Sequence, residues 1–344
     1  MIRDYMNGRN LSNKAVVNAI LTLIVVFSGC AYSAETAADK EQVRVGTWNV
    51  EHFMKMFDQD RMPERSRNMT EYYADDEDQY EVAAVLKAES FNPDIVVIQE
   101  CCDQEMLEHF CKKWFPDRFA FIKVFEANVP GQNIGVLAKP GFEAIRLEHY
   151  TNDKDPVTDN SLRYTKQNAG LWEKNLLFSR GPGFVLFQTP KENKFWVGAT
   201  HSKSKSGNNK AVTQWRIREY ERTRQICAEL IATSGTKNLL IMGDFNDDFG
   251  MDNIETSLGQ DAIEVMLEGE GNEKLISLDE TYRKAHPDAA TYHCAIKPPK
   301  YRSFLDHIFA SPETAKHEVK TVMIDESIAF AASDHLPLLT VLEF

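Results

Sequence analysis

Cysteine is scarce in this chain, and its spacing excludes one common kind of metal site. Only six of the 344 residues are cysteine, and none of them form the CxxC pairs typical of structural zinc sites. A zinc site built from cysteines is therefore not expected. Two states remain open for the thiols of an oxidising compartment: a bridge from Cys111 to Cys101 or Cys102, or buried reduced side chains.

The chain also lacks an excess of positive charge. It carries 39 Lys and Arg against 52 Asp and Glu, which gives a formal net charge of −13. Such a surface does not attract a polyanion as a whole. A few local Lys and Arg residues beside a metal ion are nevertheless enough to hold a phosphate group. If the substrate is a nucleic acid, we therefore expect it to bind in a local cleft and not across the whole surface.

A predominantly apolar run extends from Ala15 to Phe27. This run follows basic residues and is too short to span a bilayer comfortably, so we predict that residues 1–34 are an export signal. Phe27-Ser28-Gly29-Cys30 resembles a bacterial lipobox, which leaves two outcomes open: lipidation of Cys30, or cleavage near Ala31 to Ala34. Either outcome predicts a periplasmic, secreted or outer-surface protein, with residues 35–42 as a polar linker.

Residues 43–344 contain no solenoid repeat and no low-complexity linker, which favours one domain. Short apolar runs alternate there with longer amphipathic stretches. The helices that we predict are Tyr80–Glu89, Gln104–Lys113 and Asn209–Ala232. The predicted strands are Val43–Asn49, Asp94–Glu100, Phe119–Phe125, Ile134–Ala138, Asn175–Phe178, Gly183–Gln188, Lys194–His201, Asn238–Met242, Phe304–Ala310, Glu318–Ile324 and Leu338–Leu342.

Several predicted strands end on polar residues that neither β-propensity nor burial favours. Because neighbouring strand ends meet on one rim of a sheet, such residues can form one site although they are distant in sequence. Each motif alone also fits ordinary turn chemistry, but their joint occurrence favours a site. The motifs are Trp48-Asn49-Val50-Glu51, Ile98-Gln99-Glu100, Ala199-Thr200-His201 and Gly243-Asp244-Phe245-Asn246.

Two segments near the C-terminus have the same character. Asp306 and His307 interrupt an apolar strand, where a charged pair is costly to bury unless each group has a partner. Asp334 and His335 precede the last strand and place a carboxylate beside an imidazole. Because successive side chains of a strand alternate between faces, we predict that His307 points away from Asp306 and is structural.

Taken in order, these motifs resemble the endonuclease/exonuclease/phosphatase superfamily, and the resemblance extends from Val43 to Phe344. It implies an α/β fold, a four-layer sandwich in which two mixed β-sheets pack face to face with helices on the outside. It also implies a divalent-metal-dependent phosphodiester hydrolase that uses in-line attack by water. A nuclease or general phosphodiesterase is the first hypothesis.

The resemblance assigns roles to individual residues. The implied metal ligands all offer oxygen, which suits Mg²⁺, or Mn²⁺ or Ca²⁺, rather than zinc. Asp244 and Asn246 resemble the pair that positions the attacking water and the scissile phosphate. His335, oriented by Asp306, is implied in acid/base chemistry or in donating a hydrogen bond to the phosphate. The metal set is Asn49, Glu51, Glu100 and Asp334; the catalytic set is His201, Asp244, Asn246, Asp306 and His335; Arg180 resembles a phosphate-contacting arginine.

Departures from the family pattern leave the substrate open. Cys102 stands where DNase I-like members carry an arginine, and only Gln132 or Asn133 falls near the place of an acidic partner for His201. Nucleic acid is the favoured substrate of an expected monomer, with phospholipid head groups or inositol and sugar phosphates as alternatives. A catalytically silent binding module is the alternative from another class. The lysines after His201 either guide a polyanion or are simply solvated; they are Lys203, Lys205 and Lys210.

Overall fold

The structure is a computed structural model, and it describes residues 40–53, 76–129, 131–155, 176–205, 209–293, 302–325 and 327–344. The predicted export signal with Cys30, most of the predicted linker, and Cys294 lie outside these ranges. Lys40–Phe344 forms one compact unit. Within the described residues, no helix combines the length and the apolar character needed to cross a membrane.

Six strands form the first sheet, in the order β13-β14-β1-β2-β4-β3. The sheet is mixed, because β1 runs antiparallel to β14 and parallel to β2. Its strands are β1 (Gln42–Phe53), β2 (Ile95–Cys101), β3 (Phe121–Phe125), β4 (Asn133–Ala138), β13 (Glu318–Met323) and β14 (Leu338–Glu343).

The second sheet also has six strands and is also mixed, since only its β7–β8 pairing is parallel. Its order is β5-β6-β7-β8-β12-β9. The strands are β5 (Glu143–His149), β6 (Gly183–Gln188), β7 (Lys194–His201), β8 (Leu239–Asp244), β9 (Ile276–Ser277) and β12 (Asp306–Ala310). A separate two-stranded hairpin consists of β10 (Tyr292–His293) and β11 (Arg302–Ser303).

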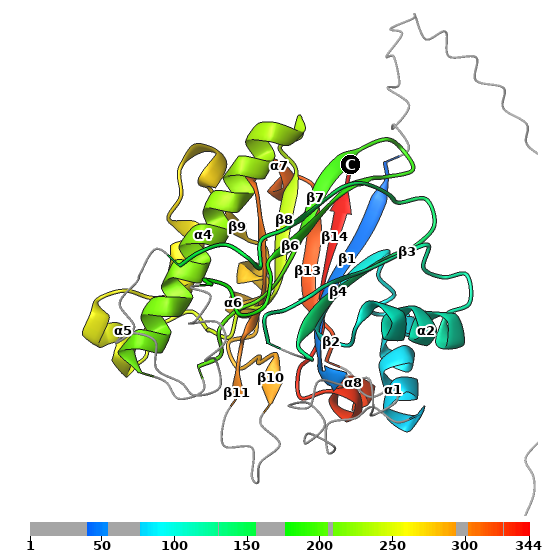
Figure 1. Ribbon diagram of the computed structural model, residues 1–344, viewed down its shortest axis with the longest axis horizontal. Coiled ribbons are helices and arrows are strands. Elements are labelled where there is room, and N and C mark those ends of the chain that lie inside the picture. Colours follow the sequence, from blue (N-terminus) through cyan, green and yellow to red (C-terminus); the bar gives the residue numbers. More distant parts are fainter. Residues whose placement is uncertain are drawn as a thin grey trace, which may run out of the picture. The chain divides into compact units, whose positions relative to one another are not determined.

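Helices lie on the outer sides of the two sheets (Figure 1). The long helix α4 packs Trp215 and Tyr220 against Trp196 and Ile241 of the second sheet. It begins after Asn209, whose side chain accepts from Val212 N at 3.1 Å, and it ends at Gly235 in the left-handed conformation. The helices are α1 (Asp76–Lys87), α2 (Gln104–Trp114), α4 (Lys210–Ser234), α5 (Asn253–Leu258), α6 (Glu280–Ala285), α7 (Pro312–Ala315) and α8 (Ser327–Ala332), with 3₁₀ turns at Ile263–Leu267 and Gly271–Glu273.

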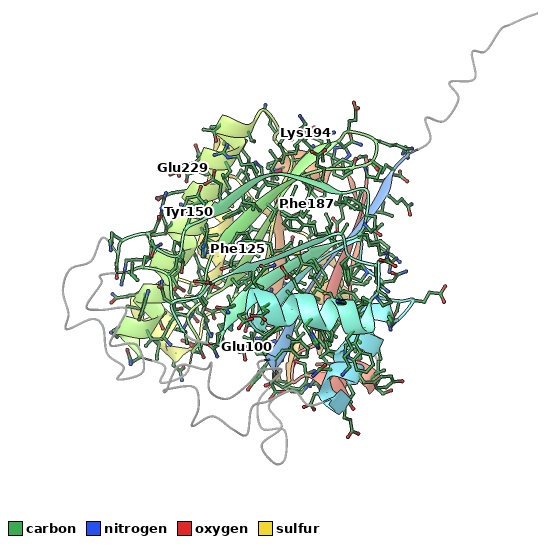
Figure 2. The ribbon with its side chains drawn as sticks, turned by 45° about the vertical axis from the view of Figure 1, so that its right-hand side comes forward. Glu100, Phe125, Tyr150, Phe187, Lys194 and Glu229 are labelled. Carbon is green, nitrogen blue, oxygen red and sulfur yellow. The ribbon has the colours of Figure 1, made fainter. Side chains whose placement is uncertain are left out.

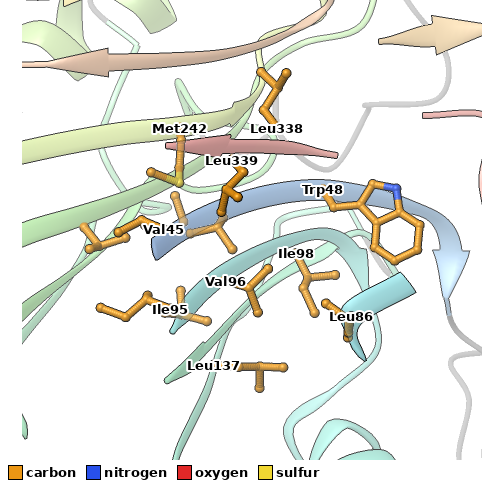
Figure 3. Close-up of a cluster of buried hydrophobic side chains, with 14 of the residues drawn as sticks. Val45, Trp48, Leu86, Ile95, Val96, Ile98, Leu137, Met242, Leu338 and Leu339 are labelled. Carbon is orange, nitrogen blue, oxygen red and sulfur yellow. The ribbon is translucent and has the colours of Figure 1, made fainter. Parts of the chain in front are cut away.

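The two sheets share one buried core. Met242 of the second sheet belongs to the same cluster of buried side chains as Val45 and Leu339 of the first (Figure 3). Leu86 of α1 covers the other face of the first sheet within this cluster. Two mixed sheets packed face to face, with helices outside, confirm the predicted four-layer α/β sandwich.

Two local predictions are wrong. Of the predicted strand Asn175–Phe178, the described residues make only an isolated bridge at Leu176, while the unpredicted β5 forms at the sheet edge. Strand β12 begins at Asp306 rather than at Phe304. Of the two states left open for the thiols, the structure shows the second, because Cys101, Cys102 and Cys111 are free and buried. Cys101 and Cys102 only place their Sγ atoms 3.9 Å apart.

Candidate active site

Strand register gathers the predicted catalytic residues at one end of the sandwich. In the second sheet His201 of β7 pairs with Asp244 of β8, and Asp244 pairs in turn with Asp306 of β12. These three residues therefore lie in one row across neighbouring strands. Glu100, the residue before the last in the first sheet's β2, lies at the same end, while Lys194, where β7 begins, lies at the opposite end (Figure 2).

The backbone at the strand ends is strained. Among the described residues, six that are not glycine have positive φ, and three of them are candidate site residues: Glu51 (45°), Glu100 (56°) and Asn246 (56°). Left-handed backbone costs a non-glycine residue on the order of 1 kcal/mol or more, and such strain clusters at functional sites. Glu51 and Glu100 lie among the last residues of β1 and β2, and Asn246 follows β8, so the strain falls where these strands end.

Gly243 is a position that only glycine fits. Its φ is 146°, and a Cβ there would lie 2.0 Å from the Thr200 carbonyl oxygen of the neighbouring strand. We expect Gly243→Ala to push β7 and β8 apart and to lower the free energy of unfolding by about 2–3 kcal/mol. Urea denaturation measures the change. Gly250→Ala is the control, since it also has positive φ (104°) but nothing within 4 Å; an equal loss in both variants would contradict the proposed clash.

Asp306 and His335 form a buried pair. His335 Nδ1 lies 2.7 Å from Asp306 Oδ2. The backbone of His335 is held on both sides, by its N–H to Ser333 Oγ at 3.0 Å and by its carbonyl, which accepts from Trp48 Nε1 at 2.9 Å. Burial lowers the pKa of His335, but Asp306, Asp244 and Asp334 outweigh burial and raise that pKa to about 10. The imidazole is therefore a cation at neutral pH.

Asp244 is the centre of the site. Its Oδ2 accepts from Asn49 Nδ2 at 3.0 Å, lies 3.3 Å from His201 Nε2 and lies 3.9 Å from His335 Nε2. Its Oδ1 accepts from the backbone N–H of Asn246 at 2.7 Å. Burial raises the pKa of Asp244, but His201, His335 and Arg180 together lower it to about 2. Asp244 is thus an ionised acceptor surrounded by donors.

His201 differs from His335 in its electrostatic surroundings. Burial and the nearby Arg180 lower its pKa, so the neutral form is favoured. Its Nδ1 has no hydrogen-bond partner among the described residues. Neither candidate for an acidic partner takes that role, because Gln132 accepts from Arg180 at 2.7 Å and Asn133 bonds to the backbone of Ala127 and Cys102.

The four predicted metal ligands meet in part. Asn49 Nδ2 lies 3.4 Å from Glu100 Oε1, and Glu51 Oε2 accepts from the backbone N–H of Asp334 at 3.0 Å. Within the described part of the chain, however, no three His, Cys, Asp or Glu side chains are drawn together closely enough to hold an ion. The donor chemistry does fit a hard divalent cation, because all four side chains offer oxygen. Burial, Glu51 and Glu100 raise the pKa of Asp334 to about 7. A bound cation would relieve the repulsion between these carboxylates.

Arg180 and Lys203 are buried beside this site. Arg180 donates from Nη1 to Gln132 and from Nη2 to the carbonyl of Ser202. Of the lysines after His201, Lys210 is exposed to solvent, as one alternative predicted. Lys203 is not, because it is only 7% exposed. Burial and Arg180 lower the pKa of Lys203 to about 8. Lys205 pairs with buried Asp247.

Sequence reasoning missed the residues that support the site from outside the motifs. Ser202 lies between His201 and Lys203, and its carbonyl accepts from both Arg180 and Asn246. Glu219 is buried in α4 and bonds to two site loops. A charged residue on a long helix gives no sequence signal of burial, so Glu219 was not detectable from the pattern.

Comparisons with solved structures find proteins of similar fold. An endonuclease/exonuclease/phosphatase from Bacteroides vulgatus is 16% identical, with a TM-score of 0.55 over 89% of this chain and 100% of its own. Bacteroides thetaiotaomicron mannosyl-6-phosphatase is 14% identical, with a TM-score of 0.55 over 88% and 99%. The human Nocturnin catalytic domain is 14% identical, with a TM-score of 0.55 over 89% and 98%.

These structures are similar in fold, and no curated protein matches at the sequence level. The model of the Endonuclease/Exonuclease/phosphatase family matches residues 46–335, a span that begins in β1 before Asn49 and ends on His335. Every candidate site residue falls inside that span. With its two-sheet sandwich and its polar strand ends, the chain belongs to the endonuclease/exonuclease/phosphatase family.

Proposed function

We propose that this protein is a divalent-metal-dependent phosphodiester hydrolase, a nuclease or general phosphodiesterase. Its family makes it a hydrolytic enzyme of the phosphoesterase type. The observation that carries the finer proposal is the convergence on Asp244, which lies 3.0 Å from Asn49, 3.3 Å from His201 and 3.9 Å from His335. One ionised carboxylate ringed by hydrogen-bond donors suits the handling of water and phosphate together.

The side chains divide the chemistry between them. Asp244 orients the attacking water as an acceptor, and Asn246, fixed through Asp244 and Ser202, helps to place the phosphate. His335 has a pKa of about 10, too high for an efficient general base at neutral pH. It acts instead as a cation that donates from Nε2 to a phosphate oxygen, while Asp306 holds its Nδ1. Neutral His201 donates from Nε2 toward Asp244, 3.3 Å away, and so helps to hold that carboxylate in place.

The oxygen donors would hold the metal. Asn49, Glu51, Glu100 and Asp334 are the residues proposed for this role, and Mg²⁺ is the expected ion, with Mn²⁺ or Ca²⁺ as alternatives. When bound, the cation would neutralise a non-bridging phosphate oxygen and the charge that develops on the leaving oxygen.

The proposed setting is outside the cytoplasm. The predicted export signal and lipobox support a periplasmic, secreted or surface-anchored location, with Cys30 as the lipidation site if anchoring occurs. Intact mass of the exported protein tests this, because diacylglycerol on Cys30 and cleavage near Ala31 to Ala34 give different masses.

Metal removal is the first functional test. We expect EDTA to reduce hydrolysis of bis-nitrophenyl phosphate by at least about 100-fold, because the cation neutralises charge in the transition state. Added Mg²⁺ or Mn²⁺ should restore the rate, whereas Glu100→Ala should remain inactive after metal is added. Undiminished turnover in EDTA would refute the metal dependence.

A phosphomonoesterase acting on sugar or inositol phosphates is the second candidate. It is favoured by the fold shared with the mannosyl-6-phosphatase of Bacteroides thetaiotaomicron. A panel of DNA, RNA, sphingomyelin, inositol phosphates, mannose 6-phosphate and bis-nitrophenyl phosphate separates the two candidates. Cleavage of monoesters alone would select the second. Cleavage of none, by folded protein with Mg²⁺ or Mn²⁺, would leave a catalytically silent binding module.

A further inference from the structure

Glu219 is a buried carboxylate that the proposed chemistry does not use. It lies in the third turn of α4, outside every motif described above, and is 2% exposed. Its Oε1 accepts from the backbone N–H of Ser179 at 3.2 Å and from Ser179 Oγ at 3.4 Å. Its Oε2 accepts from the backbone N–H of Lys203 at 2.7 Å. One side chain therefore ties together two loops that are distant in sequence.

Both loops carry groups of the candidate site. Ser179 precedes Arg180, and Lys203 follows Ser202. The Ser202 carbonyl accepts from Arg180 Nη2 and, at 3.2 Å, from Asn246 Nδ2. The Ser202 N–H in turn donates to the Asp244 carbonyl at 2.9 Å. The Ser202 carbonyl is thus an acceptor that Arg180 and Asn246 share. Glu219 holds the residue that follows it, Lys203.

The carboxylate does more than balance charge. A buried ionised carboxylate is costly unless donors satisfy it. Its hydrogen bonds described above go to backbone N–H groups and a hydroxyl, not to the side chains of Arg180 or Lys203. Burial raises the pKa of Glu219 above its ordinary value, and these backbone bonds and the two nearby cations offset only part of that rise. Such bonds set the positions of loops more than they neutralise cations.

We propose that Glu219 is a positioning residue for the substrate phosphate: it holds the 179–180 and 202–203 segments in register, so that Arg180 and Asn246 meet the phosphate together. This inference rests on the proposed function, because it assumes that a phosphate ester binds beside Asp244. It adds a residue from α4, the long helix on the outer side of the second sheet.

The substitution Glu219→Gln distinguishes a counter-charge role of Glu219 from a role in positioning the loops. Glu219→Gln keeps the size of the side chain and removes its charge. If Glu219 acted only as a counter-charge to Arg180 and Lys203, its neutralisation would tighten phosphate binding. If it positions the loops, binding weakens, because a glutamine presents only one acceptor oxygen and its amide group faces the second loop's N–H.

The test compares Glu219→Gln with Glu229→Gln, a matched control on the same helix whose exposed carboxylate pairs with Arg222 at 2.6 Å. Calorimetry with inorganic phosphate and Mg²⁺ should show Kd weakened about 10-fold in Glu219→Gln, and kcat/KM on a phosphate ester should fall about 10- to 100-fold. The control should match the original protein. Glu219→Gln combined with Arg180→Met should lose little more than Arg180→Met alone.

Hydrogen exchange gives a readout that needs no activity. Amides of residues 178–181 and 201–205 should exchange at least about 10-fold faster in Glu219→Gln than in Glu229→Gln. Tighter phosphate binding, unchanged exchange in both loops, or additive effects with Arg180→Met would each overturn the positioning role. Faster exchange in a protein that neither binds phosphate nor cleaves esters would leave the two loops held by Glu219 but refute the assumed substrate, and with it the proposal.

Discussion

Asp244→Asn is expected to lower kcat/KM for a phosphodiester by about 10³-fold or more, because it removes the one acceptor on which the site's donors converge. The replacement has the same shape, but it has one acceptor oxygen in place of two. Asn49 Nδ2, His201 Nε2 and the Asn246 N–H all donate toward Asp244 in the present protein. In the variant at least one of them faces an N–H group instead.

The charge of Asp244 matters beyond its hydrogen bonds. It is one of the carboxylates that raise the pKa of His335, so its loss also weakens the cationic state of that imidazole. Steady-state kinetics on bis-nitrophenyl phosphate with Mg²⁺ measures the effect, with the far-ultraviolet spectrum and the unfolding midpoint as checks of folding. Asp153→Asn is the control, since it removes only a half-exposed pair with Arg222. A tenth or more of the original activity in Asp244→Asn would refute the central role.

Residues at the ends of buried strands could be predicted from sequence. The runs before Asn49, Glu100, His201 and Asp244 are apolar enough to predict strands, and a polar residue at the end of each is a local signal. The structure brings Asn49, His201, Asp244, Asp306 and His335 together through pairing that sequence order alone does not reveal. Parallel pairing of β7 with β8 is what aligns two such ends.

Other features depend on contacts that no local pattern encodes. Strand β5 exposes Ile145 and Leu147 while Arg146 and Glu148 are half-buried, so its alternation is the reverse of the usual one. The burial of Lys203 could not be predicted, because its local sequence is that of an ordinary loop lysine. Glu219 differs from the other acids of α4 only in the two loops that reach it. Tertiary packing, not propensity, decides each case.

His307 shows how the face of a strand separates chemistry from structure. Asp306 points to His335, whereas the next residue points to the opposite face, as predicted from strand alternation. There His307 Nδ1 lies 3.0 Å from Asp279 Oδ2, and its Nε2 lies 3.0 Å from the Asp247 carbonyl. Both ring nitrogens thus face acceptors, which favours the imidazolium. Burial lowers the pKa of His307, but Asp279 outweighs burial and raises it.

Breaking this buried pair should be strongly destabilising. Asp279→Asn leaves the His307 cation without its counter-charge, and we expect the free energy of unfolding to fall by about 3–5 kcal/mol. Asp279 also accepts from Arg283 Nε at 2.8 Å and from the Ile308 N–H at 3.0 Å, so the loss extends to α6 and β12. Urea denaturation near pH 5.5 measures the change. Glu280→Gln, which breaks the neighbouring exposed pair with Lys284, should leave stability unchanged.

The same pair predicts how the loss varies with pH. Asp279, whose pKa is lowered on folding, contributes stability above its unfolded pKa of about 3.9, and this is lost as pH falls through the folded value. His307, whose pKa is raised on folding, contributes fully below its unfolded pKa of about 6.5, and this is lost as pH rises through the folded value. The stability difference between the original protein and Asp279→Asn should therefore be greatest between about pH 4 and pH 6.5 and should shrink toward alkaline pH. A difference that stays constant or grows as pH rises would contradict the imidazolium assignment.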